Sequence, residues 1–250
     1  MSSTTHIELI PIDKFNINNV EISFPTEAPI KTDNKVVGSY MRCDLKYRHK
    51  GDKVGPILLQ APKVFSFGLG EDYTFGKDRV PDNVNGYKVT YFLANPDKSN
   101  KDLVQTPEQV KFTQTLKLLN EKAIAHFKEN SDCFDKNKKL AAENGTIVKP
   151  IFSKPTIKTG KKHPKTGKEI REIDESKPFQ FDLKCMINPK TKKFITKFYG
   201  PGDKELDPMN LIKKLGDIEP VVKVDYIYIG DNASFQLRLY EANFTPKGSL

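Results

Sequence analysis

Four lysines and three aromatic residues lie between two turn signals in the segment NPKTKKFITKFYGPG, residues 188–202. Ammonium groups attract phosphates, and rings stack on unpaired bases. If residues 192–199 form one strand, successive side chains point to opposite faces. One face would carry Lys192, Phe194, Thr196 and Phe198, and the other Lys193, Ile195, Lys197 and Tyr199. Each face would then combine a ring with a cation, which suits a polyanion whose bases are unpaired.

An ordinary structural interpretation of the same segment stays open. Phe194 and Phe198 could belong to the core, while the lysines protect the edge of a sheet from aggregation. Composition alone does not decide between the two interpretations.

Two further clusters and one loop share this chemistry. KYRHKGDK (46–53) and YTFGKDR (73–79) mix rings with cations, and residues 149–171 hold eight Lys and Arg against one Glu. The loop 158–168 could clamp a strand or be a solvated linker. The predicted nucleic-acid contacts are Lys46, Tyr47, Arg48, Lys50, Lys53, Tyr73, Phe75, Lys77, Arg79, Lys158, Lys161, Lys162, Lys165, Lys190, Lys192, Lys193, Phe194, Lys197, Phe198 and Tyr199.

The elements that must position these side chains are mostly strands. Alternating or apolar segments bounded by turn residues predict strands at 35–49, 86–93, 179–187 and 192–200, and a last hairpin around GDNA, 230–233. A short helix is predicted at 207–216, ending at Gly216.

One long helix is predicted in TPEQVKFTQTLKLLNEKAIAHFKEN. Thr106 is a natural N-cap, Pro107 suits the first helical position, and Gln109 completes a capping box. Apolar residues at spacings of three and four lie on one face. They are Phe112, Leu116, Leu119, Ala123 and Phe127. We therefore expect a β-rich α+β fold, with one domain over residues 1–250 and a helical and basic-loop insertion at about 104–178.

Composition narrows the class of protein further. The 250 residues carry a net charge of +9, which favours polyanionic partners. The N-terminus has no basic segment followed by an apolar run, and no apolar run approaches the thickness of a bilayer, so we expect neither secretion nor a membrane partner. Cys43, Cys133 and Cys185 stand far apart, which predicts a reducing, intracellular environment without disulfides.

The sequence shows no arrangement of residues that is typical of a catalytic site. GLGED (68–72) is a turn rather than a phosphate loop, and Pro81-Asp82 lacks the acid-x-Lys that would complete a nuclease motif. The four histidines are scattered, and His126 is expected to be a packing or surface residue. We predict no enzyme activity, no cofactor and no metal.

The order of features resembles the single-stranded-DNA-binding proteins of nucleocytoplasmic large DNA viruses. The matching stretches cover about two-thirds of the chain and are SYMRCDLKYRHKGDKVGPILLQAP, the long helix, FQFDLKCMINPKTKKFITKFY with its motif Ile187-Asn188-Pro189, and VVKVDYIYIGDNASFQLRLYEA. The resemblance implies an OB-fold, here an OB-like antiparallel barrel, that binds single-stranded DNA in viral replication, repair or recombination. Replication proteins would be further partners. The chain ends NFTPKGSL, so recruitment through an acidic tail is not expected.

We therefore predict sequence-nonspecific binding of single-stranded DNA, at a viral replication site in the host cytoplasm or nucleus. The sequence leaves RNA binding, oligomeric state and packaging into virions open. One rival is a structural virion or matrix protein that contacts the genome through charge alone, and another is a degenerate nuclease.

Overall fold

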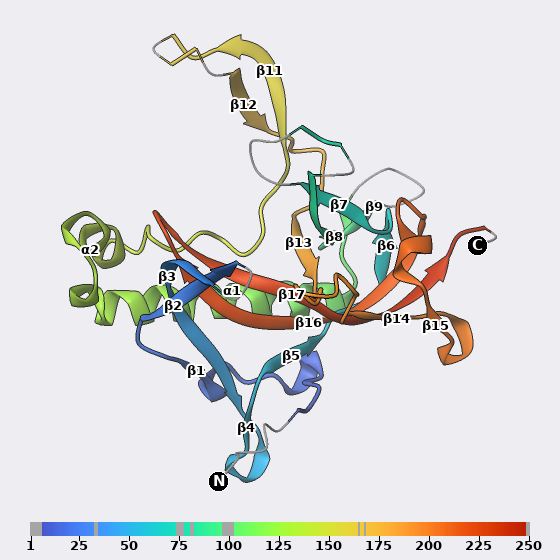
Figure 1. The fold of residues 1–250 in the computed structure, drawn as a ribbon, viewed down its shortest axis with the longest axis horizontal. Helices are drawn as coiled ribbons and strands as arrows, with labels where there is room; N and C mark the ends of the chain where they lie inside the picture. Colours follow the sequence, from blue (N-terminus) through green and yellow to red (C-terminus); the bar gives the residue numbers. More distant parts are fainter. Residues whose placement is uncertain are drawn as a thin grey trace.

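A computed structural model gives the fold of residues 7–32, 35–73, 78–80, 83–96, 103–164, 166–167 and 169–248. It is a strand-rich α+β structure in which one long helix lies along a mixed sheet (Figure 1). No helix in the described ranges is long and apolar enough to cross a membrane.

The main sheet has a continuous path of seven strands. In spatial order these are β1 (Val20–Ile22), β3 (Lys35–Arg48), β16 (Gly216–Ile229), β17 (Ala233–Pro246), β13 (Gln180–Cys185), β8 (Val84–Phe92) and β7 (Gly70–Tyr73). Strands off this path are β2 (Thr26–Thr32), β4 (Val54–Gly55), β5 (Ile57–Gln60), β6 (Val64–Ser66), β14 (Lys197–Tyr199) and β15 (Glu205–Leu206). β17 pairs in parallel with β13 and β14, and antiparallel with β16. The predicted last hairpin is thus confirmed, as β16 and β17.

Two small pairs stand outside this sheet. They are β9 (Asn95–Pro96) with β10 (Leu103–Val104), and β11 (Thr156–Lys162) with β12 (Glu169–Ile173). The β11–β12 hairpin extends away from the rest of the molecule (Figure 1).

The long helix α1 (Pro107–Glu129) confirms its sequence signals. The Thr106 hydroxyl accepts from the Gln109 N–H, and the Gln109 side chain accepts from the Thr106 N–H. All five predicted apolar positions are buried. The Phe112 ring contacts Tyr91 of β8 and Phe181 of β13, with centroids 5.7 and 6.3 Å apart. α1 therefore covers one face of the sheet. A second helix, α2 (Lys136–Glu143), was not predicted.

The alternation of buried and exposed residues defines the two faces of the sheet. Val89, Leu183, Leu239 and Val222 are buried toward α1. The residues between them point the other way, because successive side chains of a strand alternate. We call the surface that α1 does not cover the open face.

The predicted OB-like barrel is not confirmed. Among the described strands, the hydrogen-bonded path begins at β1 and ends at β7 without a pairing that closes it. The segment just before β6 approaches β8 through a side chain instead, because the hydroxyl of Tyr91 donates to the Pro62 carbonyl at 2.7 Å.

Two local predictions are wrong. Residues 192–200 do not return as one strand beside 179–187, because a single bridge joins Ile187 to Phe194 and the chain then leaves to form β14 beside β17. Residues 207–216 hold only one 3-10 turn, Pro208–Leu211, and Gly216 opens β16. A side chain at Gly216 would collide with the Phe244 ring at 2.5 Å, so packing explains this glycine.

Candidate nucleic-acid interface

A row of four cations crosses the open face. Lys223 of β16 pairs with Arg238 of β17, Arg238 pairs with Lys184 of β13, and Lys184 pairs with Lys88 of β8. Directly paired residues share a face, so register alone aligns these side chains. The row spans three strand spacings, about 14 Å.

Carboxylates accompany the row. Asp225 lies 2.6 Å from Lys223 and 3.9 Å from Arg238, Asp72 lies 3.3 Å from Lys184, and Asp182 lies 2.6 Å from Lys88. Four cations and three carboxylates leave one net positive charge. Ion pairs at such partly exposed positions contribute little, so a phosphate can compete for the cations.

Tyrosines lie at the β3 end of this face. The Tyr40 ring is 5.5 Å from Tyr228 and 6.0 Å from Tyr226, and the Arg42 guanidinium is 5.3 Å from the centre of the Tyr226 ring. Tyr228 is 38% exposed. Burial, and then a hydrogen bond with Tyr40, raises the pKa of Tyr226 above its ordinary value.

Phenylalanines lie at the opposite end. Phe92 follows Lys88 and Thr90 on the same face of β8, and the Phe67 ring lies 5.9 Å from it. Phe67 is 60% exposed. Lys88 and Lys213 line a pocket of about 360 Å³ beside these two rings. Rings thus flank the cation row on both sides.

The lysine loop, residues 188–197, lies beside the open face. The side-chain carbonyl of Asn188 accepts from the N–H groups of Lys190 and Thr191, at 2.9 and 3.1 Å, which closes the turn. Lys190, Lys192, Lys193 and Lys197 are exposed. No acidic side chain in the described part of the chain pairs with them. The loop therefore carries most of the uncompensated charge near this face.

Thr196 fixes the lysine loop to the sheet. Its buried hydroxyl accepts from the Met186 N–H at 2.7 Å and donates to the Leu239 carbonyl at 2.6 Å. One side chain thus joins the loop to both β13 and β17.

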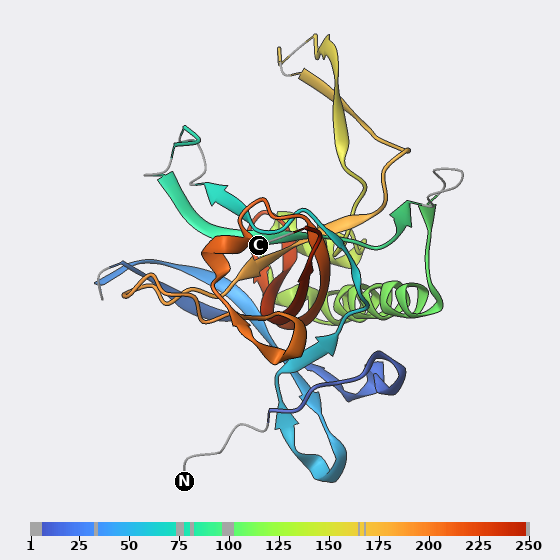
Figure 2. The same ribbon diagram turned by 90° about the vertical axis from the view of Figure 1, so that its right-hand side faces the viewer.

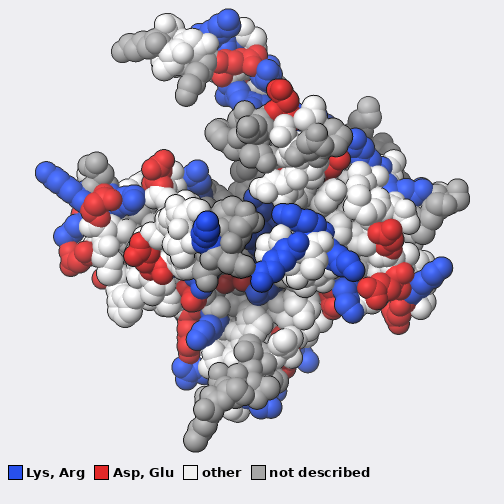
Figure 3. Space-filling model, in the orientation of Figure 1, with Lys and Arg blue, Asp and Glu red and all other residues white. Residues whose placement is uncertain are grey.

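The β2–β3 hairpin and the lysine loop project to the same side of the sheet, away from α1 (Figure 2). Figure 3 looks onto that side and shows Lys and Arg side chains gathered near its centre, over β13 and β17. The open face therefore lies between two projecting segments, the β2–β3 hairpin and the lysine loop.

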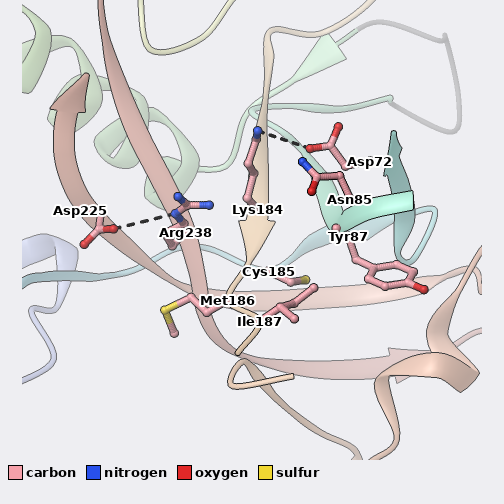
Figure 4. Close-up of a pocket in the computed structure, with 10 residues that line it drawn as sticks. Asp72, Asn85, Tyr87, Lys184, Cys185, Met186, Ile187, Asp225 and Arg238 are labelled. Atoms are coloured by element: carbon pink, nitrogen blue, oxygen red, sulfur yellow. Dashed lines mark ion pairs between the residues drawn. The ribbon is translucent and has the colours of Figure 1, made fainter. Parts of the chain in front are cut away.

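A pocket of about 430 Å³ lies in the middle of this surface. The residues that line it include Asp72, Asn85, Tyr87, Lys184, Met186 and Arg238, and in Figure 4 Lys184 points toward Asp72, which lies beside Asn85. The Tyr87 ring contacts Phe194 of the lysine loop at 5.1 Å. A bulge in β16 between Val224 and Tyr226 places Asp225 at the pocket edge.

Some predicted contact residues cannot stack on a base in this structure. Tyr47 is 4% exposed and Phe198 is 1% exposed, because both rings pack in the core. The predictions for these two rings are wrong. Phe194 is half-buried against the core and Tyr73 and Tyr199 are half-buried as well, so each keeps an exposed part.

The predicted basic clusters do not come together. The cluster at 46–53 lies at the β3–β4 turn, while β7 with Tyr73 and the β11–β12 hairpin lie toward the opposite end of the molecule (Figure 1). Lys46, Arg48, Lys50 and Lys53 are exposed there, but Arg48 pairs with Glu21. In the hairpin, Lys158 pairs with Glu169 at 2.9 Å, while Lys161 and Lys162 are exposed. Arg79 is exposed, and Phe75, Lys77 and Lys165 lie outside the described residues.

Sequence reasoning missed the residues that the open face brings together. They are Tyr40, Phe67, Lys88, Phe92, Lys184, Lys223, Tyr226, Tyr228 and Arg238. The segment VVKVDYIYIG does show the alternation of apolar residues with Lys223, Tyr226 and Tyr228. The cation row carries no such signal, since it depends on strand register.

A family model described as a protein of unknown function (DUF2738) matches residues 31–249. The chain belongs to this family. The description of DUF2738 assigns no activity, and the match does not show the viral single-stranded-DNA-binding family. No curated protein matches this DUF2738 chain.

Among solved structures, this DUF2738 chain is similar to gp2.5, a single-stranded DNA binding protein encoded by bacteriophage T7. The likeness covers 76% of this chain and 88% of gp2.5, with 14% identity and a TM-score of 0.33. A score of that size is too low to bear on the fold or the function of the DUF2738 chain. Among the described residues, no group of three or more His, Cys, Asp and Glu side chains could hold a metal ion.

Proposed function

We propose that this protein binds single-stranded DNA on the open face and catalyses no reaction. One observation carries the proposal: a row of four cations is flanked by exposed rings at both ends, on the face that the helix leaves uncovered. Single-strand binders combine these two groups, cations for the backbone and rings for the bases.

The two kinds of group act at different ranges. Lys190, Lys192 and Lys193 attract the strand at long range and release its counterions. The cations of the row then meet the backbone phosphates, exchanging their carboxylate partners for them. Tyr228 at one end and Phe67 at the other stack on bases, which a paired duplex does not offer. The protein therefore holds a strand in its unpaired form.

Ring removal tests the stacking. Phe67→Ala should weaken binding of a fluorescent oligothymidine about fivefold to a hundredfold, because one stacked base contributes roughly 1–3 kcal/mol. Phe24 is a matched control, since it is 65% exposed and contacts His126 of α1, away from the open face. Phe24→Ala should leave the affinity unchanged. If neither change weakens binding while lysine changes do, the protein contacts nucleic acid through charge alone, as a structural component would.

Three further arms of the same titration define the ligand. The affinity for a duplex of equal length should be lower than for oligothymidine, and equal affinity would contradict the proposal. Oligouridine shows whether the 2′-hydroxyl is tolerated. Labelled DNA incubated with the protein, magnesium and manganese should stay intact, whereas cleavage would contradict the absence of catalysis.

A further inference from the structure

The pocket in the middle of the open face is lined by donor, acceptor and apolar groups, whereas a phosphate needs only donors and cations. Lys184 and Asp72 present a donor and an acceptor side by side, 3.3 Å apart. Asn85 lies next to Asp72, while the ring of Tyr87 points away from this pair (Figure 4). Apolar atoms of Met186 and Ile187 complete the lining. A volume of about 430 Å³ is in the ~300–1,000 Å³ range of small-ligand pockets.

A glycine keeps this pocket open. Gly86 of β8 pairs with Asp72 of β7, so a side chain at residue 86 would share the face of Asp72. A Cβ built on Gly86 meets no heavy atom within 4 Å. A side chain at residue 86 would therefore enter the open space beside Asp72.

We infer that this pocket takes one unpaired base of the bound strand and prefers guanine; the inference rests on the proposed function. Guanine differs from the other bases in having two adjacent donors, the ring N1–H and the exocyclic amino group, which match the two oxygens of one carboxylate. The O6 acceptor of guanine lies next to these two donors, just as the ammonium donor of Lys184 lies next to the carboxylate of Asp72. Cations recognise O6 and N7 of guanine in the same way in duplex grooves.

The test compares oligothymidine with the same oligomer carrying one central guanine or one central hypoxanthine. Hypoxanthine differs from guanine only by lacking the exocyclic amino group. The guanine oligomer should bind about fivefold to a hundredfold more tightly than oligothymidine, and hypoxanthine should lose most of that gain.

Asp72→Asn separates base recognition from charge. Removing a carboxylate from a cationic face should raise the affinity for oligothymidine and yet abolish the guanine preference. Asp182→Asn is the matched control, since Asp182 also pairs with a lysine of the row but does not line this pocket. That variant should raise the general affinity and keep the preference.

Gly86→Val tests the pocket by filling it. A β-branched residue suits a strand, so the variant should fold, which its melting temperature will show. Its affinity for the guanine oligomer, taken as a ratio to its own affinity for oligothymidine, should fall to about one, so that the guanine preference is lost. Equal binding of the guanine and thymidine oligomers by the unaltered chain, or a preference that survives both variants, overturns the inference alone. Failure of every oligomer to bind overturns the proposed function as well.

Discussion

At the scale of single residues, similar side chains have opposite roles according to where the backbone places them. Phe194 and Phe198 lie four residues apart in one lysine-rich segment, yet the first is half-buried beside Tyr87 and the second is sealed in the core. The buried hydroxyl of Thr196 between them decides this, because its two hydrogen bonds direct the chain from β13 to β17.

Replacing Thr196 should therefore cost stability. Thr196→Val keeps the shape but leaves the Met186 N–H and the Leu239 carbonyl without this partner. Leaving a buried polar group unsatisfied costs about 1–3 kcal/mol, and we expect a loss of that size in urea denaturation. Thr245→Val is the control, since Thr245 is an exposed threonine of β17. A change smaller than about 0.5 kcal/mol in Thr196→Val, the usual range for surface positions, would contradict the anchoring role.

The cysteines give a second test at this scale. Burial raises the pKa of Cys43 and of Cys185 to about 12, whereas Cys133 is exposed. Because the thiolate is the reactive form, iodoacetamide at pH 8 should modify Cys133 in the native protein and spare the other two. Mass spectrometry of peptides would show this, with all three thiols reacting in urea. Rapid modification of native Cys185 would mean that the pocket beside it opens in solution.

At the scale of elements, the lysine loop and the strands make different contributions to the proposed binding of DNA. The strands hold cations that already have carboxylate partners, while the loop presents lysines that have none among the described residues. The loop should accordingly dominate the dependence on salt, and the strands should dominate the contact with bases.

Neutralising the loop tests that division. Changing Lys190, Lys192 and Lys193 together to Gln should reduce the slope of log affinity against log salt by about 2, since each phosphate contact on a single strand contributes roughly 0.7. The control changes the exposed lysines Lys111, Lys117 and Lys128 of α1, which alters the net charge equally on the covered side of the sheet. Equal slopes in both variants would show that net charge, rather than the loop, sets the salt dependence.

At the scale of the whole molecule, α1 ties the N-terminal segment to the sheet. His126 of α1 lies with Nε2 3.1 Å from the Ser23 carbonyl, and its ring contacts Phe24 and Phe127. Burial lowers the pKa of His126, and the contact with Ser23 offsets only part of that effect. The expected packing role of this histidine is thus confirmed.

The lowered pKa predicts how stability varies with pH. An unfolded histidine takes up a proton near pH 6.5, whereas folded His126 takes it up only at lower pH. The unfolded state then binds more protons, so the free energy of unfolding should fall as the pH drops through about 6.5. Denaturation curves at pH 7.5 and 5.5 measure this, and His126→Gln should show a smaller fall. An equal fall in both proteins would assign the effect to other groups.

The amino-acid sequence by itself determined the features that depend on near neighbours. Thr106, Pro107 and Gln109 sufficed to predict where α1 begins, because a cap is made within one turn of helix. Alternation likewise predicted β3, β8, β13 and the β16–β17 hairpin. Composition predicted an affinity for polyanions, since charge acts without regard to fold.

Only the tertiary structure decided which rings and cations share a surface. Lys88, Lys184, Lys223 and Arg238 come from four strands, and a shift of one residue in any pairing would turn a cation toward the core. Register is set by the packing of buried residues over long separations in the chain, which short motifs do not encode. For the same reason the predicted ring Phe198 lies in the core, and the rings at the ends of the cation row are Tyr228 and Phe67.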